Sequence, residues 1–176
     1  MSTRGLIGFV HKGEVKCYLS EHSSQLSNLG SDIVERSELI DDWDSFTELY
    51  EKITWGDKEI TSCEEPLNAR TLIPAIHNEE IEMLVDSSSF AEDTLFCEYA
   101  YLLNLDRREL EIYSSNYQTK HDQTDKHLPL NLLATYPLHE IPNHWKEFIE
   151  ARSTEVEHDW SDFYRNQGIE PNDLEL

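Results

Sequence analysis

Residues 95–113 read LFCEYAYLLNLDRRELEIY, and this stretch decides the fold that the sequence predicts. Along it, two sets of side chains alternate. One set consists of Tyr99, Tyr101, Leu103 and Leu105, and the other of Ala100, Leu102 and Asn104. Asp106-Arg107-Arg108 then offers a turn before a second strand-like run, residues 109–113. A period of two is typical of a strand with one buried face, so the stretch predicts a β-hairpin.

Two further patterns lie upstream of this hairpin. Residues 4–10 and 15–20 are short apolar runs separated by His11-Lys12-Gly13-Glu14, which predicts a first hairpin. Helices are expected over residues 31–53, the first capped by Ser31 and the second opened by a capping box of Ser45 and Glu48. The second helix carries its apolar side chains at helical spacing: Phe46, Leu49, Tyr50 and Ile53.

The pattern is weaker between residues 54 and 89. Residues 71–73 are expected to form a short strand, and residues 79–85 fit either a helical turn or a strand. Further helices are expected over residues 142–167, with Pro142 as a first helical residue and Gly168 as a stop.

These elements predict an α+β fold without βαβ alternation, namely an antiparallel sheet built from the two hairpins and packed against amphipathic helices. One domain is expected over residues 1–169, followed by an acidic tail at residues 170–176. The expected core consists of ten side chains: Ile7, Phe9, Phe46, Leu49, Ile53, Tyr101, Leu103, Trp145, Phe148 and Trp160.

Charge is the property that constrains the partners of this chain. Thirty-six acidic residues against fourteen Lys and Arg give 176 residues a formal net charge of −22. High charge and a mean hydropathy of −0.61 are also found in disordered chains, but four Trp, eight Tyr and six Phe favour a folded core. Such a field repels nucleic acid and anionic membranes, so neither is an expected partner.

The cysteine pattern and the apolar runs indicate a compartment. Cys17, Cys63 and Cys97 are odd in number and far apart, which is typical of reduced thiols in an intracellular protein. No basic start precedes a long apolar run, and no eighteen apolar residues stand together. We therefore expect a soluble, cytoplasmic protein.

The opening, Met1-Ser2-Thr3-Arg4-Gly5-Leu6-Ile7-Gly8-Phe9, resembles a family of uncharacterised bacterial, phage and fungal proteins that begin Met-x-Thr-Arg-Gly. The similarity continues through Leu29-Gly30 and the second hairpin and so spans residues 1–113. The connector motif of that family, Asn-His-x-Asp-Ser-Tyr-Pro, is degenerate: its Asn, His and Asp fall on Ser20, Glu21 and Ser23, its Tyr-Pro falls on Gln25-Leu26, and Ser24 alone is retained. The resemblance implies a fold and no established activity.

One enzymatic hypothesis uses the start of the chain. Removal of Met1 would leave Ser2 with a free α-amino group beside its hydroxyl, the arrangement of N-terminal-nucleophile amidohydrolases. Arg4 would then bind an anionic substrate. The alternative is an ordinary strand start with Arg4 in an ion pair. Because no oxyanion donors are evident, we expect no enzyme and keep the amidohydrolase as the alternative.

Possible metal ligands gather in the polar segment after the second hairpin, namely His121, Asp122, Asp125 and His127. Zinc and nickel use such side chains, but no regular element holds them in a ligand geometry. We interpret them as solvated loop residues and expect no metal and no cofactor.

Carboxylates at helical spacing form the remaining constellation. Those expected to bind a partner are Asp32, Glu35, Glu38, Asp41, Asp42, Asp44, Glu48 and Glu51. A row of carboxylates can occupy sites built for phosphates. The sequence therefore favours a protein-binding factor that engages a basic protein surface, such as that of a DNA- or RNA-handling effector in defence or anti-defence.

Overall fold

A computed structural model describes residues 4–21, 24–117, 119, 121–140 and 145. The chain divides into two compact units, Met1–Pro142 and Asn143–Leu176, and the fold described below is that of the first unit. In chain order its elements are β1 (Arg4–His11), β2 (Glu14–Ser20), η1 (Leu26–Gly30), α1 (Ser31–Ser37), α2 (Trp43–Glu51), β3 (Thr54–Gly56), β4 (Ile60–Thr61), α3 (Leu72–His77), β5 (Ile81–Val85), η2 (Ser88–Glu92), β6 (Cys97–Asn104), β7 (Glu109–Ser114) and β8 (Asn131–Pro137).

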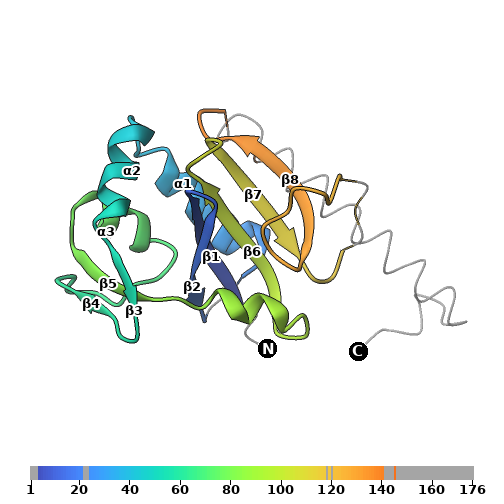
Figure 1. Cartoon of the computed structure of the whole chain (residues 1–176), viewed down its shortest axis with the longest axis horizontal. Helices are drawn as coiled ribbons and strands as arrows, with labels where there is room; N and C mark the ends of the chain where they lie inside the picture. The colour runs from blue at the N-terminus through green and yellow to red at the C-terminus, as the bar shows by residue number, and fades with distance from the viewer. Residues whose placement is uncertain (1–3, 22–23, 118, 120, 141–144, 146–176) are drawn as a thin grey trace, which may run out of the picture. The chain divides into compact units, whose positions relative to one another are not determined.

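A five-stranded sheet in the order β2-β1-β6-β7-β8 forms the centre of this unit (Figure 1). The predicted hairpins are confirmed as the antiparallel pairs β1–β2 and β6–β7, and the α+β class is confirmed with them. The prediction of a wholly antiparallel sheet is wrong at the junction of the hairpins, because β1 and β6 run parallel, with Ile7 opposite Tyr101. Parallel neighbours need a long connection, and residues 21–96 supply it.

The turns of the two hairpins lie at the same end of the sheet and are bonded to each other. Lys12 and Gly13 both have positive φ, 51° and 74°, which is the type I′ geometry that matches strand twist. Their main-chain N–H groups donate to the two carboxylate oxygens of Asp106, at 2.8 and 2.9 Å. Asp106 therefore fixes the first turn against the second and helps to set the parallel register.

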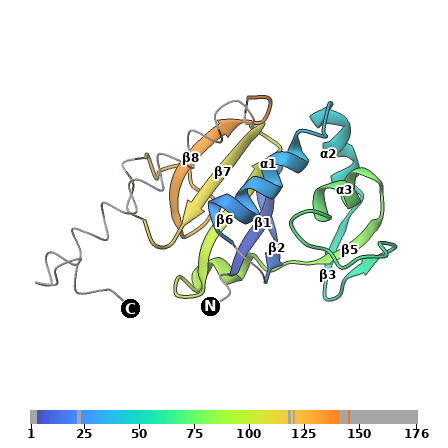
Figure 2. The same ribbon diagram turned by 180° about the vertical axis from the view of Figure 1, so that it is seen from behind.

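Both faces of the central strands are buried, whereas the sequence pattern predicts one buried face. On one face, the ring centroid of Phe9 lies 4.8 Å from that of Tyr50 of α2, and α1 crosses the same sheet (Figure 2). On the other, Leu6, Leu102 and Tyr113 pack in a cluster that includes Ala91 of η2 and Leu130. Burial on both sides is typical of strands that take part in parallel pairing.

The helix starts differ from those predicted. A π-helical turn, η1, runs directly into α1, so Ser31 does not cap; its hydroxyl instead donates to the Leu26 carbonyl at 3.2 Å. For α2, the cap is Asp42 rather than Ser45, because the Asp42 carboxylate accepts from the N–H groups of Asp44 and Ser45. Asp is as good a cap as Ser, and α2 begins at Trp43.

A second, three-stranded sheet in the order β3-β5-β4 lies beside the first, together with α3. The strand predicted at residues 71–73 is wrong, because Leu72 and Ile73 begin α3. Pro74 fits there as the third helical residue, where an N–H has no intrahelical partner. Of the two alternatives for residues 79–85, the strand is observed, as β5.

One strand, β8, was not predicted at all. It pairs antiparallel with β7, and the register shifts between Ile112 and Tyr113. Its sequence, Asn131–Pro137, follows a polar segment and does not keep the strict alternation of apolar and polar residues that is typical of a strand. The strand is therefore recognised only from the neighbour with which it pairs.

The predicted core is largely confirmed among the described residues. Seven of its members are buried, Leu49 is half-buried, and two lie outside the described residues: the buried ones are Ile7, Phe9, Phe46, Ile53, Tyr101, Leu103 and Trp145, and those outside are Phe148 and Trp160. The helices expected over residues 142–167 and the tail at residues 170–176 also fall almost wholly outside the described part of the chain. The domain limits therefore stay a prediction.

Candidate functional site

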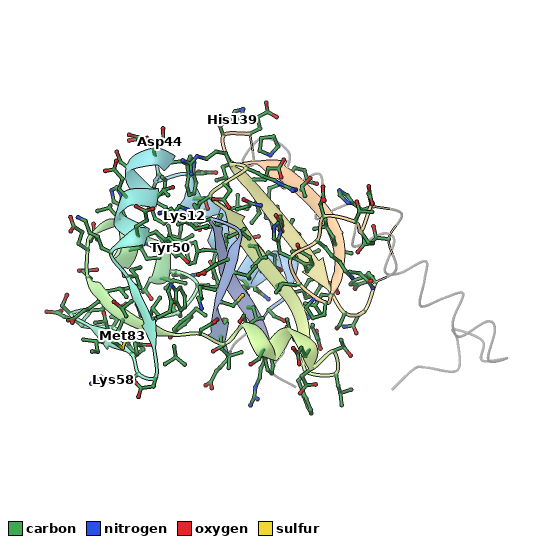
Figure 3. The ribbon with its side chains drawn as sticks, in the orientation of Figure 1. Lys12, Asp44, Tyr50, Lys58, Met83 and His139 are labelled. Atoms are coloured by element: carbon green, nitrogen blue, oxygen red, sulfur yellow. The ribbon has the colours of Figure 1, made fainter. Side chains whose placement is uncertain are left out.

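The eight predicted partner-binding carboxylates lie on α1, on α2 and on the connection between them. Seven are exposed, and Asp32 is half-buried. Asp44 lies at the start of α2, near the edge of the first unit (Figure 3). Helical spacing alone does not decide which of them are available to a partner, because their contacts within the chain differ.

Four of the eight have partners within the chain. Asp32 accepts from Arg70 Nε at 2.9 Å, and Asp42 caps α2. Asp44 pairs with Arg108 Nη2, and Glu51 accepts from both Lys12 Nζ and His11 Nε2, each at 2.7 Å. These contacts tie α1 and α2 to the sheet turns and to the segment before α3.

The pKa values of two of these carboxyls report the same contacts. The hydrogen bond from Lys12, followed by that from His11, holds the pKa of Glu51 below its usual range. For Asp42 the hydroxyl and N–H of Ser45 lower the pKa of the carboxyl. Both groups therefore remain ionised at neutral pH in structural roles.

The other four carboxylates are exposed and have no ion pair or hydrogen bond among the described residues; we name Glu35, Glu38, Asp41 and Glu48 the acidic ridge. Leu39 lies between them in sequence, and 56% of its surface is exposed, while the next residue, Ile40, is buried. The end of α1 thus presents a large apolar side chain among unpaired negative charges.

A buried polar cluster that the sequence did not predict lies in the β6–β7 hairpin. Glu111 is 2% exposed and has three partners. Its carboxylate accepts from Asn104 Nδ2 at 2.7 Å and from the Tyr113 hydroxyl at 2.5 Å, and His127 Nδ1 lies 2.9 Å away. The main-chain N–H of His127 also donates to the Tyr113 oxygen, at 2.9 Å. A Glu between Leu110 and Ile112 in a strand was the available signal for this cluster.

Three of the four possible metal ligands named from the sequence make contacts with different partners. His127 turns to Glu111, the His121 ring bonds the Asp122 carbonyl, and Asp125 lies 3.7 Å from Arg107. In the part of the chain that the structure describes, no three His, Cys, Asp or Glu side chains converge as metal ligands. His121, Asp122 and Asp125 do line one small hollow of about 180 Å³ together with Glu111.

The structure describes one of the two residues of the amidohydrolase hypothesis. Ser2 lies outside the described residues, and Arg4 is exposed at the start of β1. The nucleophile that the hypothesis requires therefore stays a prediction.

The cysteines are free thiols. Cys17 and Cys97 are buried in the sheet, whereas Cys63 is half-buried. Burial, with a smaller effect from Asp93, raises the pKa of Cys97 to about 12, and burial also raises the pKa of Cys17. Neither buried thiol forms a nucleophilic thiolate at neutral pH.

A cavity of about 810 Å³ lies beside the end of β2. Its walls come from β2, from η1 and α1, from the segment before α3, and from the end of β5. This cavity could not be predicted from the sequence, because these four segments meet only in the folded chain.

Comparisons with protein families, with curated proteins and with solved structures find no match to this chain. The family resemblance of residues 1–113 therefore stays a prediction. Among the described residues, no helix combines the length and apolar character needed to cross a membrane.

Proposed function

We propose that this chain is an acidic protein-binding factor that engages a basic surface of a partner protein through the acidic ridge. The observation that carries the proposal is the contrast within α1 and α2. Four carboxylates there have partners in the chain, whereas Glu35, Glu38, Asp41 and Glu48 are exposed and have none among the described residues. Unpaired like charges repel one another, and a cationic partner relieves that cost.

Leu39 gives the ridge an apolar contact. Charge complementarity accelerates encounter and selects the sign of the partner, whereas much of the binding free energy comes from a few desolvated anchors. A side chain that is 56% exposed and lies between Glu38 and Asp41 in the sequence matches that arrangement. We propose Leu39 as the anchor and the four carboxylates as its charged rim.

The finer proposal concerns the partner. Proteins that hold DNA or RNA carry basic grooves that neutralise phosphates, and a chain of net charge −22 is attracted to such grooves. We propose a cytoplasmic DNA- or RNA-handling effector as the partner, inhibited or regulated by carboxylates in its phosphate sites, in a defence or anti-defence setting.

The test compares two variants that remove the same charge. The ridge variant carries Glu35→Gln, Glu38→Gln, Asp41→Asn and Glu48→Gln. Its matched control changes four exposed carboxylates elsewhere: Asp57→Asn, Glu64→Gln, Glu82→Gln and Glu92→Gln. Asp42 is left intact because it caps α2, and Asp44 because it already has a partner in Arg108.

Partners captured from the native host with the wild-type chain are identified by mass spectrometry, and the affinity of the purified pair is then measured at two salt concentrations. We expect the ridge variant to bind at least tenfold more weakly, the control to stay within about twofold, and wild-type affinity to fall steeply above about 0.1 M salt. Equal losses in both variants, or affinity indifferent to salt, would overturn the proposal.

A further inference from the structure

The outer edge of β2 has main-chain groups at Val15, Cys17 and Leu19 that no other strand pairs. The type I′ turn at Lys12-Gly13 places His11 opposite Glu14 as the first hydrogen-bonded pair. In an antiparallel ladder such pairs alternate, so the N–H and C=O groups of Lys16, Tyr18 and Ser20 face β1. Those of Cys17 and Leu19 face away from the sheet.

The contacts of Cys17 support this alternation. Its carbonyl accepts from the Ser87 N–H at 2.8 Å, and its N–H donates to Asp86 Oδ1 at 3.2 Å. The chain leaving β5 therefore covers the edge at Cys17. No hydrogen bond from a described residue outside the β1–β2 pair reaches the main chain of Leu19.

Leu19 opens onto the cavity of about 810 Å³, hereafter the β2-edge groove, whose lining includes Tyr18, Leu19, Asn28, Asp32, Glu65 and Val85. Three contacts hold its walls in place. The Tyr18 hydroxyl lies 3.1 Å from Glu59 Oε2 and 3.3 Å from the Leu67 carbonyl, and Arg70 bonds Asp32 across the groove. The groove thus exists before any ligand arrives, which reduces the entropy cost of binding.

The chemistry of the lining indicates what fits. Glu21, Asp32 and Glu65 face a single cation, Arg70, so the groove carries a net negative charge. Val85, 38% exposed, adds an apolar surface to the same wall. An extended segment that alternates apolar and basic side chains can satisfy both kinds of surface, since its side chains alternate in direction.

We propose that the β2-edge groove binds an extended basic segment of the partner protein, which pairs with the main chain of Leu19 as an added strand. This inference rests on the proposed protein-binding function and names the part of the partner that docks. Exposed strand edges are the usual templates for strand addition, in which main-chain bonds give affinity and side-chain contacts give specificity.

The probe is a fluorescein-labelled peptide, Val-Arg-Val-Arg-Val-Arg, titrated with the full chain by fluorescence anisotropy. We expect Glu65→Lys in the groove to weaken binding at least fivefold and Glu64→Lys to change it by less than about twofold. Glu64 is the matched control because it is exposed, adjacent and not part of the lining. Far-UV circular dichroism confirms that both variants fold.

Two further measurements test the strand pairing. A peptide N-methylated at alternate residues, so that one edge loses its donors, should not bind, and the Leu19 amide should exchange more slowly with solvent when the unmodified peptide is present. Absence of peptide binding, equal effects of Glu65→Lys and Glu64→Lys, or unchanged exchange at Leu19 would overturn the inference.

The ridge variant separates this inference from the proposed function. It should bind the peptide as the wild type does, because its four substitutions lie outside the groove lining. If the peptide fails to bind while the captured partner still depends on the ridge, the groove assignment alone is wrong. If the peptide binds but no partner depends on the ridge, the proposed function fails and the groove remains.

Discussion

Glu111 and the carboxylates of the acidic ridge lie in opposite surroundings. The Glu111 side chain is 3% exposed and is held by Asn104, Tyr113 and His127, whereas the ridge carboxylates are exposed and unpaired among the described residues. A buried charge is tolerated only when its hydrogen bonds are satisfied, and an exposed one needs no partner in the chain. The comparison teaches that a small inner set of acidic residues supports the fold, which leaves the outer set available for binding.

Removal of Glu111 should have the largest effect. We expect Glu111→Ala to lower the free energy of unfolding by about 3–5 kcal/mol, because it leaves Asn104, Tyr113 and His127 without their common acceptor. Urea unfolding followed by circular dichroism measures this. Glu109→Ala is the control, because Glu109 lies on the same strand but is half-buried. Comparable losses of unfolding free energy in the two variants would contradict the special role of the buried carboxylate.

Asp86 is an intermediate case, since its side chain is 27% exposed. Burial acts to raise the pKa of this carboxyl, but hydrogen bonds from the N–H groups of Cys17 and Ser88, from the Ser88 hydroxyl and from Lys16 outweigh it and hold the pKa below its usual range. We expect Asp86→Asn to cost about 1 kcal/mol at neutral pH, discounted for partial exposure.

The pH dependence of that difference has a defined sign. A lowered pKa in the folded state contributes stability above the unfolded pKa, about 3.9, and that contribution is lost as pH falls through the folded pKa. The gap between wild type and Asp86→Asn should therefore be full above about pH 5 and shrink towards pH 2. A gap that widens in acid would contradict the assignment.

A smaller effect is expected at Asp44, whose side chain is 85% exposed. We expect Asp44→Asn to change the free energy of unfolding by less than about 0.5 kcal/mol, because exposed ion pairs contribute little. Its partner Arg108 keeps the Thr47 hydroxyl at 2.8 Å and the Leu105 carbonyl at 2.6 Å. Arg108→Ala, which removes all three contacts, should lower the free energy of unfolding by more, as measured by the same urea unfolding. A larger loss in Asp44→Asn than in Arg108→Ala would contradict this expectation.

The acidic ridge should contribute least to stability. The ridge variant should be at least as stable as the wild type, because removing four of the unpaired negative charges reduces self-repulsion. Stability of the wild type should also rise more with salt than that of the variant, as the screening length falls from about 30 Å at 0.01 M to 3 Å at 1 M. A destabilised ridge variant would mean that these carboxylates have structural roles.

The hairpins were predictable from sequence because their contacts are local. Alternation at residues 99–105 and the Gly13 turn are visible within a few residues, and both hairpins are observed. The parallel pairing of β1 with β6 was not predictable, because the pattern of apolar residues in one segment does not indicate which distant segment it pairs with. The error at residues 71–73 has another cause: Pro74 is compatible with the first turn of a helix, and apolar triplets fit either element.

The candidate site was predicted in composition and not in arrangement. The sequence predicted eight carboxylates as a partner-binding set, but the residues that pair with some of them, Arg70, Arg108 and Lys12, come from distant segments. The difference between engaged and available carboxylates therefore required the fold. The β2-edge groove was beyond sequence reasoning for the same reason.

The parallel pairing of β1 with β6 also determines when the protein can fold during synthesis. Gly5 pairs with Tyr99, so β1 is made before a neighbour that is encoded roughly ninety residues later. Long-range pairing of this kind slows folding, and an apolar strand left with an open edge is prone to pair with other nascent chains. Until β6 has been synthesised, the β1–β2 hairpin therefore has an unpaired edge on β1.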